Sequence, residues 1–384
     1  MFRSIEHVWP KSIGVDRPPE IFVSKSVCDP CNHLCGLFVD GPFSKSWFIT
    51  NEKLNSDFCF LDPEKPTATS LAYMGQLKDF PVEPGWVCDN WSGPSGEHIY
   101  HLRPASEPIW DTYVGGNPKR QKKKSEAGRA YIHLTADDDF WLFVGISSFH
   151  KHFTRSRRFC LTSVDSDFDG ADVIFPPPDM DDPIVRKDVE YIRGKSSVNI
   201  VSSQIDLGFA DRFLCKLALG LGSNIIGEEF VLSEYAAILR AGLREASYEK
   251  RRALGVQGTA YDLGAKLWVQ EAWGYSGGWT IYVSTVGGDL SVSIAHPSGH
   301  ISAVRVSKNI EIREDLLRRY NEGEIYVAVP SVGKFIGPYS LGAYLSHRHG
   351  GSPIAELSRI DQLKMPFGAL PSRRRPSKDG LGSA

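Results

Sequence analysis

The chain has 384 residues, long enough for two domains, and its 41% hydrophobic and 23% charged content is typical of a globular protein. Seven cysteines are too few for a disulfide scaffold and fit a reduced intracellular protein. No apolar run reaches the roughly 18–20 residues that cross a bilayer, and the first residues, MFRSIEH, lack the apolar core of a signal peptide. We therefore expect a cytoplasmic protein without a membrane partner.

The net charge of −2 does not by itself predict nucleic-acid binding. Charge is nevertheless unevenly distributed along the chain. Basic residues gather at 119–124, 155–158 and 373–375, and acidic residues gather at 137–139 and 179–182. Local basic patches of this kind can bind a polyanion even when the total charge is slightly negative.

Residues 1–40 predict the order strand, loop, strand, helix. Apolar and polar residues alternate over 4–9, which predicts a strand that ends at Pro10 and directs Glu6 and His7 to opposite faces. Residues 21–27 form a β-rich run and are the expected partner strand. Asp29 is a suitable N-cap with Pro30 at the first helical position, so we expect a short helix that carries Cys31, Asn32 and Cys35.

The remaining sequence predicts a larger α+β region. We expect short strands and loops over 41–118, an exposed basic loop at 117–128, a buried strand over 140–146, and two helices within 206–246 that Gly227 separates. Gly287, Gly288 and Asp289 predict a hairpin between strands 279–286 and 290–294, and further strands are expected at 301–306 and 325–329. The expected fold class is α+β, with a small unit at 1–55, an α+β accessory domain with a helical pair and a β meander at 56–370, and a disordered tail at 371–384.

Two short motifs carry the functional signal. Residues 6–10 read Glu-His-Val-Trp-Pro, and residues 28–32 read Cys-Asp-Pro-Cys-Asn. Each is common in unrelated proteins, but their order and spacing together are specific. Over residues 4–40 the chain resembles the HNH endonuclease family, the ββα-metal nucleases, in the subgroup with Glu-His-Val-x-Pro followed by Cys-x-x-Cys-Asn. Residues 213–219 resemble, more loosely, a Lys-Leu/Ile-Ala-Leu helix that follows the nuclease unit in some long members.

The resemblance implies a small ββα-metal fold and a metal-dependent endonuclease that hydrolyses phosphodiester bonds in DNA. By position, His7 would be the general base, and Glu6 and Asn32 would hold a catalytic Mg²⁺ or Mn²⁺ ion. An imidazole suits the task because its unperturbed pKa of about 6.5 lies near the operating pH.

The sequence departs from the family pattern in two ways. Members of this subgroup usually carry an earlier Cys-x-x-Cys that completes a four-cysteine zinc site, but only three residues precede Ser4 here. A structural Zn²⁺ at Cys28 and Cys31 is therefore open: the true start lies upstream, the site has decayed, or Cys35, Cys59 or Cys88 completes it. In addition, the middle Asn of the family has no clear counterpart between residues 19 and 27.

Two other functional classes remain open from the sequence. A catalytically eroded HNH scaffold would act as a nucleic-acid- or protein-binding module, and a chance resemblance would leave an unrelated binding protein. The histidine pairs 98/101 and 150/152 have ligand-like spacing, but we expect solvated loop histidines there, and residues 137–139 more often form a turn before a strand. The sequence does not indicate the target sequence, whether the substrate is DNA or RNA, the biological pathway or the oligomeric state.

Overall fold

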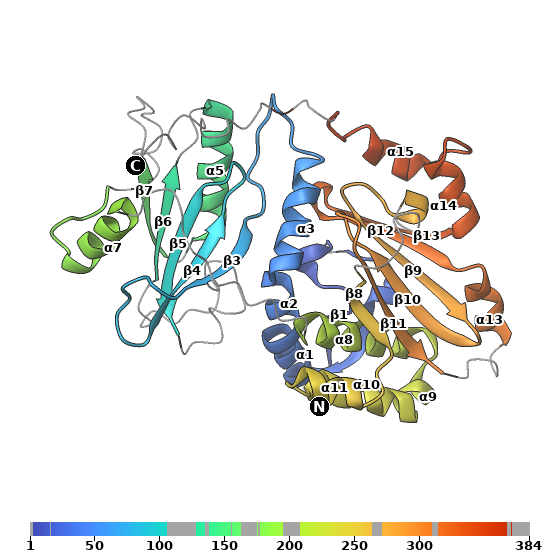
Figure 1. Cartoon of the computed structure of the whole chain (residues 1–384). Helices are drawn as coiled ribbons and strands as arrows, with labels where there is room; N and C mark the ends of the chain where they lie inside the picture. Colours follow the sequence, from blue (N-terminus) through green and yellow to red (C-terminus); the bar gives the residue numbers. More distant parts are fainter. Residues whose placement is uncertain are drawn as a thin grey trace, which may run out of the picture. The chain divides into compact units, whose positions relative to one another are not determined.

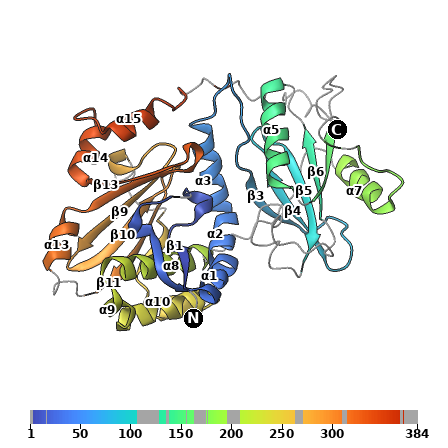
Figure 2. The same cartoon turned by 180° about the vertical axis from the view of Figure 1, so that it is seen from behind.

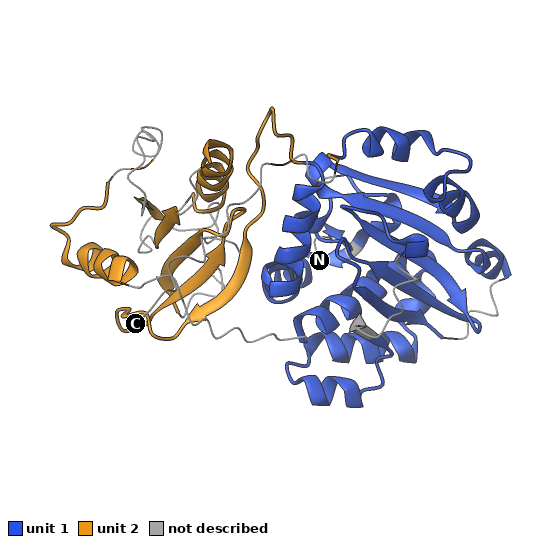
Figure 3. Ribbon diagram, turned by 45° about the horizontal axis from the view of Figure 1, so that its top comes forward, with its two compact units in different colours: residues 1–60, 206–364 blue, residues 61–205, 365–384 orange. Residues whose placement is uncertain are grey.

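The computed structural model divides the chain into two compact units, which are described separately (Figure 3). Unit 1 comprises residues 1–60 and 206–364, and unit 2 comprises residues 61–205 and 365–384. The structure describes residues 3–15, 17–105, 128–134, 138–154, 156–162, 175, 177–194, 208–262, 271–308, 314–366 and 370. The expected basic loop at 117–128, except Gly128, and the expected tail at 371–384 lie outside these residues.

Unit 1 begins with a two-stranded hairpin that leads into a helix. Strands β1 (Arg3–His7) and β2 (Val23–Cys28) are antiparallel, with Glu6 opposite Ser24 and His7 opposite Val23. Helix α1 (Asp29–Cys35) follows β2 without a loop and contacts both strands. The predicted order of two strands and a helix is therefore present, although the residue that caps α1 is Cys28 and not Asp29.

Three further helical segments continue from α1. They are a π-helical turn η3 (Gly36–Asp40), α2 (Gly41–Lys45) and α3 (Trp47–Phe58). The expectation of strands and loops from residue 41 is wrong for this stretch. A hydrogen bond from Ser46 Oγ to the Phe43 carbonyl (2.7 Å) marks the corner between α2 and α3, a local role that serine often takes.

The larger part of unit 1 is an antiparallel sheet against which α8 (Gly208–Ile225) packs (Figures 1 and 2). The sheet order is β13-β12-β9-β10-β11-β8. Its strands are β8 (Gly258–Asp262), β9 (Trp279–Val286), β10 (Asp289–Ala295), β11 (Ile301–Ser307), β12 (Glu324–Val329) and β13 (Lys334–Ser340). The other helices are α9 (Glu228–Val231), α10 (Glu234–Arg244), α11 (Tyr248–Ala253), α13 (Glu314–Asn321), α14 (Leu341–Arg348) and α15 (Ala355–Asp361).

Several sequence predictions for unit 1 are confirmed. The hairpin pairs Asp289 with Val286, and Gly287 and Gly288 adopt the positive φ angles that its tight turn requires. Helices α8 and α10 lie in the predicted helical region, and Gly227, also at positive φ, ends the connection that follows α8.

The N-terminal hairpin shares its hydrophobic core with α8 and the sheet. Trp9 and Phe22 are fully buried, Trp9 packs edge-on against Phe213 of α8, and Phe43 stacks on the same ring with centroids 3.9 Å apart. Hydrophobic burial therefore joins residues 1–60 to 206–364, which differs from the expected division at residue 55.

Unit 2 is built on a five-stranded sheet in the order β3-β4-β5-β6-β7, in which only β6 and β7 pair in parallel. The strands are β3 (Ala72–Leu77), β4 (Trp86–Ser92), β5 (His98–Pro104), β6 (Arg129–Leu134) and β7 (Arg157–Thr162). Helices α5 (Asp139–His152) and α7 (Pro183–Gly194) contribute to separate hydrophobic clusters with alternate residues of these strands, so they cover opposite faces of the sheet.

The predicted strand at 140–146 is wrong, because these residues form the first half of α5. Asp138 caps the helix by accepting hydrogen bonds from the amides of Phe140 and Trp141. Only Val144 and Ile146 in residues 140–146 are β-branched, and no turn signal interrupts the sequence before His152. A helix can therefore bury this run against the sheet. A short apolar run alone does not distinguish these two structures.

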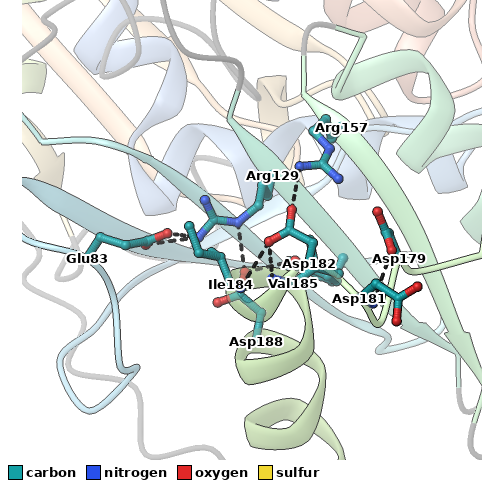
Figure 4. A network of polar contacts seen from close by, with 10 residues as sticks. Glu83, Arg129, Arg157, Asp179, Asp181, Asp182, Ile184, Val185 and Asp188 are labelled. Carbon is teal, nitrogen blue, oxygen red and sulfur yellow. Dashed lines mark hydrogen bonds and ion pairs between the residues drawn. The ribbon is translucent and has the colours of Figure 1, made fainter.

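A buried ionic network joins β6 to α7 in unit 2 (Figure 4). The Arg129 guanidinium donates to Asp188 Oδ2 (2.8 Å) and to both oxygens of Glu83 (2.8 and 2.9 Å), and it lies over the Trp86 ring. Tyr131 donates to the same Asp188 oxygen (2.8 Å). The bonds from Arg129 and Tyr131 to Asp188 connect α7 to β6, and the bond from the guanidinium is charge-assisted.

Within the part of the chain that the structure describes, no helix is both long enough and apolar enough to cross a membrane. The structure is a mixed α+β fold with several sheets, as predicted. Expectations about cellular location receive no further support from it.

A second buried carboxylate ties α3 to the turn between β10 and β11. Glu52 is 2% exposed and accepts hydrogen bonds from the Ser298 amide (2.7 Å), the Ser298 hydroxyl and His300 Nδ1 (3.1 Å). Burial opposes ionisation of Glu52, but the bonds from His300 and Ser298 outweigh it and lower the pKa of Glu52. The same bond to Glu52 raises the pKa of His300.

These opposite shifts predict a pH window for the Glu52–His300 pair. The contribution of His300 to stability is full below its ordinary pKa of 6.5 and is lost as the pH rises through its higher folded-state pKa. That of Glu52 is full above 4.5 and is lost as the pH falls through its lower folded-state pKa. We expect Glu52→Gln to destabilise the protein by about 2 kcal/mol between pH 4.5 and pH 6.5, where both groups are charged, and by less at lower and higher pH.

Urea denaturation at a series of pH values measures this difference. The matched control is Glu20→Gln, at an exposed carboxylate of unit 1, which should change the free energy of unfolding by less than about 0.5 kcal/mol. A destabilisation by Glu52→Gln that is the same at every pH would contradict the assignment.

Candidate functional site

The site is built where α1 lies against β1. The Asn32 amide nitrogen donates to Ser4 Oγ (2.9 Å) and to the Ile5 carbonyl (3.0 Å), so both of its hydrogens are used to hold α1 on the strand. The register of β1 on β2 shifts between Ser4 and Glu6, so simple alternation of faces does not hold across Ile5. The structure thus brings Asn32 beside the strand that carries Glu6 and His7.

Glu6 is buried and is held by a lysine that is distant in sequence. The Lys216 ammonium, from α8, contacts Glu6 Oε1 at 2.5 Å, Asp40 Oδ2 at 2.6 Å and the His7 carbonyl at 3.0 Å. An ammonium group has three N–H donors, and these three acceptors use all of them. We call Glu6, Asp40 and Lys216 the lysine clamp.

The π-helical turn η3 places Asp40 in the clamp. This turn lies between α1 and α2, and it adds a residue to the turn so that Asp40 faces Lys216. Lys216 itself lies in the middle of α8 among buried apolar residues, so its side chain reaches the carboxylates from the core side.

Burial and charge set the protonation of the clamp. Burial disfavours the charged ammonium, but the two carboxylates outweigh that effect and raise the pKa of Lys216. Burial also raises the pKa of Glu6 and of Asp40, and the attraction of Lys216 opposes this only in part. With all three groups charged, the clamp carries a net charge of −1, so it retains attraction for a cation.

His7 follows Glu6 at the end of β1. Its side chain is half-buried, and its carbonyl oxygen is fixed by Lys216. Ile5 is 61% exposed, whereas the Nδ1 atom of the His7 ring is buried. Leu34 is likewise 53% exposed, so neither Ile5 nor Leu34 packs into the larger part of unit 1, whereas Trp9 and Phe22 do.

The residues present fit a hard divalent cation by their chemistry. Lys216 contacts one oxygen of Glu6, and a carboxylate has a second oxygen with its own lone pairs. Both amide hydrogens of Asn32 are used on β1, which leaves its carbonyl oxygen as the available donor atom. Oxygen donors of these types suit Mg²⁺ and Mn²⁺, so Glu6 and Asn32 would be the ligands from this chain.

The cysteines provide a weaker case for structural zinc. Cys28 and Cys31 are close enough for the Cys31 amide to contact Cys28 Sγ at 3.4 Å. Cys35 is held as a thiol, because burial raises its pKa to about 11. Cys59 lies at the end of α3 near Ser276, and Cys88 is buried in unit 2. Among the described residues, no group of three or more His, Cys, Asp or Glu side chains could hold a metal ion.

The other histidine pairs do not form shared sites. His98 and His101 lie on β5, not on a loop, and their spacing places them on opposite faces of the strand. His150 and His152 lie in the last turn of α5, where His150 Nδ1 contacts Arg158 (3.1 Å) and His152 Nε2 contacts the Thr69 carbonyl (3.0 Å). Asp138, in the acidic run 137–139, is the cap of α5.

The lysine clamp contains two residues that the sequence analysis did not assign to the site. Lys216 lies in the 213–219 helical run that resembles the accessory helix of the family, which was the only signal for it. Asp40 had no such signal in the sequence, because its contact with Lys216 depends on a π-helical turn.

Searches against protein-family models, curated proteins and solved structures found no match to this chain.

The clamp predicts a large cost for removing its ammonium. Lys216→Met would leave two carboxylates buried without a counter-charge, so we expect a loss of about 3 kcal/mol in the free energy of unfolding. Adding Asp40→Asn to that variant should recover part of the loss, since it removes one uncompensated charge. Chemical denaturation monitored by circular dichroism measures both.

Lys250→Met, at an exposed lysine of α11, is the matched control and should be nearly neutral. An equal loss in Lys216→Met and in the double variant would show that the two carboxylates are not coupled through the ammonium.

The cysteine geometry predicts little bound zinc. A closed structural site needs four ligands, and Cys28 and Cys31 supply two. We expect the full-length protein to bind less than one equivalent of Zn²⁺, measured by elemental analysis. We also expect residues 1–55 alone to be unfolded with or without Zn²⁺, because Trp9 and Phe22 lose their partners from α8 and the sheet.

Stoichiometric zinc that disappears in Cys31→Ser would contradict this prediction. It would mean that a closed four-ligand site forms after all, with ligands beyond the described side chains.

Proposed function

We propose that this protein is a metal-dependent endonuclease of the HNH type, which hydrolyses phosphodiester bonds in DNA. The observation that carries the proposal is the contact of Asn32 with β1: the hairpin β1–β2 leads directly into α1, and Asn32 donates to Ser4 and Ile5 of the strand that also carries Glu6 and His7. A ββα unit with these three residue types in this order is what the sequence resemblance implies.

In this proposal His7 removes a proton from the attacking water through an imidazole nitrogen. The backbone of His7 is held by Lys216, which limits the movement of the base relative to Glu6. When bound at Glu6 and Asn32, a divalent cation would stabilise negative charge on the scissile phosphate and the leaving oxygen. The exposed side chains of Lys11 and Arg17, in the connection between β1 and β2, and of Lys25, on β2, would attract the DNA backbone.

A second candidate function is a binding module on an eroded HNH scaffold. The burial of Glu6 and its ion pair with Lys216 favour this candidate, because an ammonium and a metal ion compete for the same carboxylate. Such a protein would bind nucleic acid or another protein through the same surface and would not cleave DNA.

Plasmid cleavage separates the two candidates. We expect the purified protein to nick or cut plasmid DNA with Mg²⁺ or Mn²⁺ and to stop when EDTA is added. His7→Ala should lower the rate by about 10²–10⁴-fold while the far-UV circular dichroism spectrum and melting temperature stay close to wild type, because removal of a general base affects rate and not packing.

His33→Ala is the matched control, since His33 is an exposed histidine on α1 and has no assigned role in the reaction. Equal cleavage by wild type and His7→Ala would end the catalytic assignment of His7. DNA binding without any metal-dependent cleavage would instead support the binding-module candidate.

A further inference from the structure

Cys28 and Cys31 form a pair across the junction of β2 and α1. Cys28 is the last residue of β2 and the N-cap of α1, and its sulfur accepts a hydrogen bond from the Cys31 amide at 3.4 Å. Cys31 is exposed and Cys28 is half-buried, so reagents in solution can reach the pair.

The helical spacing of the pair suits a disulfide. Cys28 is the N-cap of α1 and Cys31 is the third residue of its first turn, and the helical φ and ψ angles of the two residues between them give a Cα separation of about 5 Å. Disulfides in proteins join Cα atoms separated by about 4.4–6.8 Å. Pro30 lies between the two cysteines and restricts the backbone there.

The other cysteines within the described residues lack this arrangement. Cys88 and Cys215 are buried, and Cys59 contacts a serine and not a second thiol. Cys35 lies one helical turn after Cys31 and is half-buried, and the charges of the lysine clamp act on its thiol. Cys160 lies on β7 in unit 2. The pair at 28 and 31 is therefore the place where an intramolecular disulfide fits.

We propose that Cys28 and Cys31 are a reversible dithiol–disulfide site that reacts with low-molecular-weight disulfides. In the first step one thiolate of the pair attacks a sulfur of the small disulfide, which forms a mixed disulfide and releases one small thiolate. The second cysteine, after losing its proton to solvent, attacks the protein-side sulfur and releases the second small thiol. The pair is oxidised by two electrons, and the small disulfide is reduced to two thiols.

The disulfide would fasten the start of α1 to the end of β2. Asn32 follows Cys31 directly and holds α1 on β1 through Ser4 and Ile5, so oxidation stiffens the segment that carries the Asn32 side chain. This inference does not depend on DNA cleavage, because the pair reacts or fails to react whatever the chemistry of His7.

The test uses full-length protein, dialysed against a chelator and equilibrated with reduced and oxidised glutathione at a series of ratios. Acid quenching, alkylation with N-ethylmaleimide and peptide mass mapping then report the state of each cysteine. We expect a Cys28–Cys31 disulfide. The fraction of protein that contains it should depend on the squared concentration of reduced glutathione divided by the concentration of oxidised glutathione. The oxidised protein should also melt at a higher temperature than the reduced protein.

Single variants identify the two roles. In Cys31→Ser or Cys28→Ser the remaining thiol should accumulate as a mixed disulfide with glutathione, because no second thiol can displace it, whereas Cys59→Ser should behave as wild type. Circular dichroism establishes that each variant is folded. The proposal is overturned if wild type shows only mixed disulfides, if both thiols remain alkylated at every ratio, or if the pair holds zinc and becomes reactive only after the metal is removed.

Discussion

The interaction on which this structure depends is the contact of one ammonium group with three oxygens. Lys216 joins the side chain of Glu6, the carbonyl of His7 and the side chain of Asp40, although it lies 209 residues after His7 in the chain. A hairpin of this size has too little core to be stable alone. The lysine clamp and the packing of Trp9 and Phe22 against α8 and the six-stranded sheet supply what a structural metal ion supplies in small metal-stapled folds.

The features that sequence predicted were those with a local cause. Gly287 and Gly288 specify a tight turn by their backbone freedom, so the hairpin β9–β10 followed directly from them. The strand β1, which ends at His7 shortly before Pro10, the partner strand β2 and the helix that begins near Pro30 are likewise determined by residues within a few positions of each element. The contact of Asn32 with β1, the strand that carries Glu6 and His7, was expected only through the family resemblance.

The features that sequence missed depend on contacts between distant segments. The run at 140–146 has no local signal that favours a helix over a strand except the cap at Asp138, and its burial under the unit 2 sheet is a tertiary effect. Asp40 reaches Lys216 through a π-helical turn, which no short pattern specifies. The assignment of residues 1–60 to a unit with 206–364 likewise follows from shared burial and not from composition.

The lysine clamp also defines what separates an enzyme from a binding scaffold here. A buried glutamate without a counter-charge would take up a proton, and a protonated Glu6 would be a poor metal ligand. Lys216 favours the ionised form that a metal ion needs, but it occupies one of the two carboxylate oxygens. Asp40 completes the balance, because its negative charge offsets the ammonium and leaves the clamp attractive to a cation. The choice between the two proposed functions, metal-dependent cleavage and binding alone, therefore depends on whether the second oxygen of Glu6 and the carbonyl oxygen of Asn32 can bind the same divalent cation.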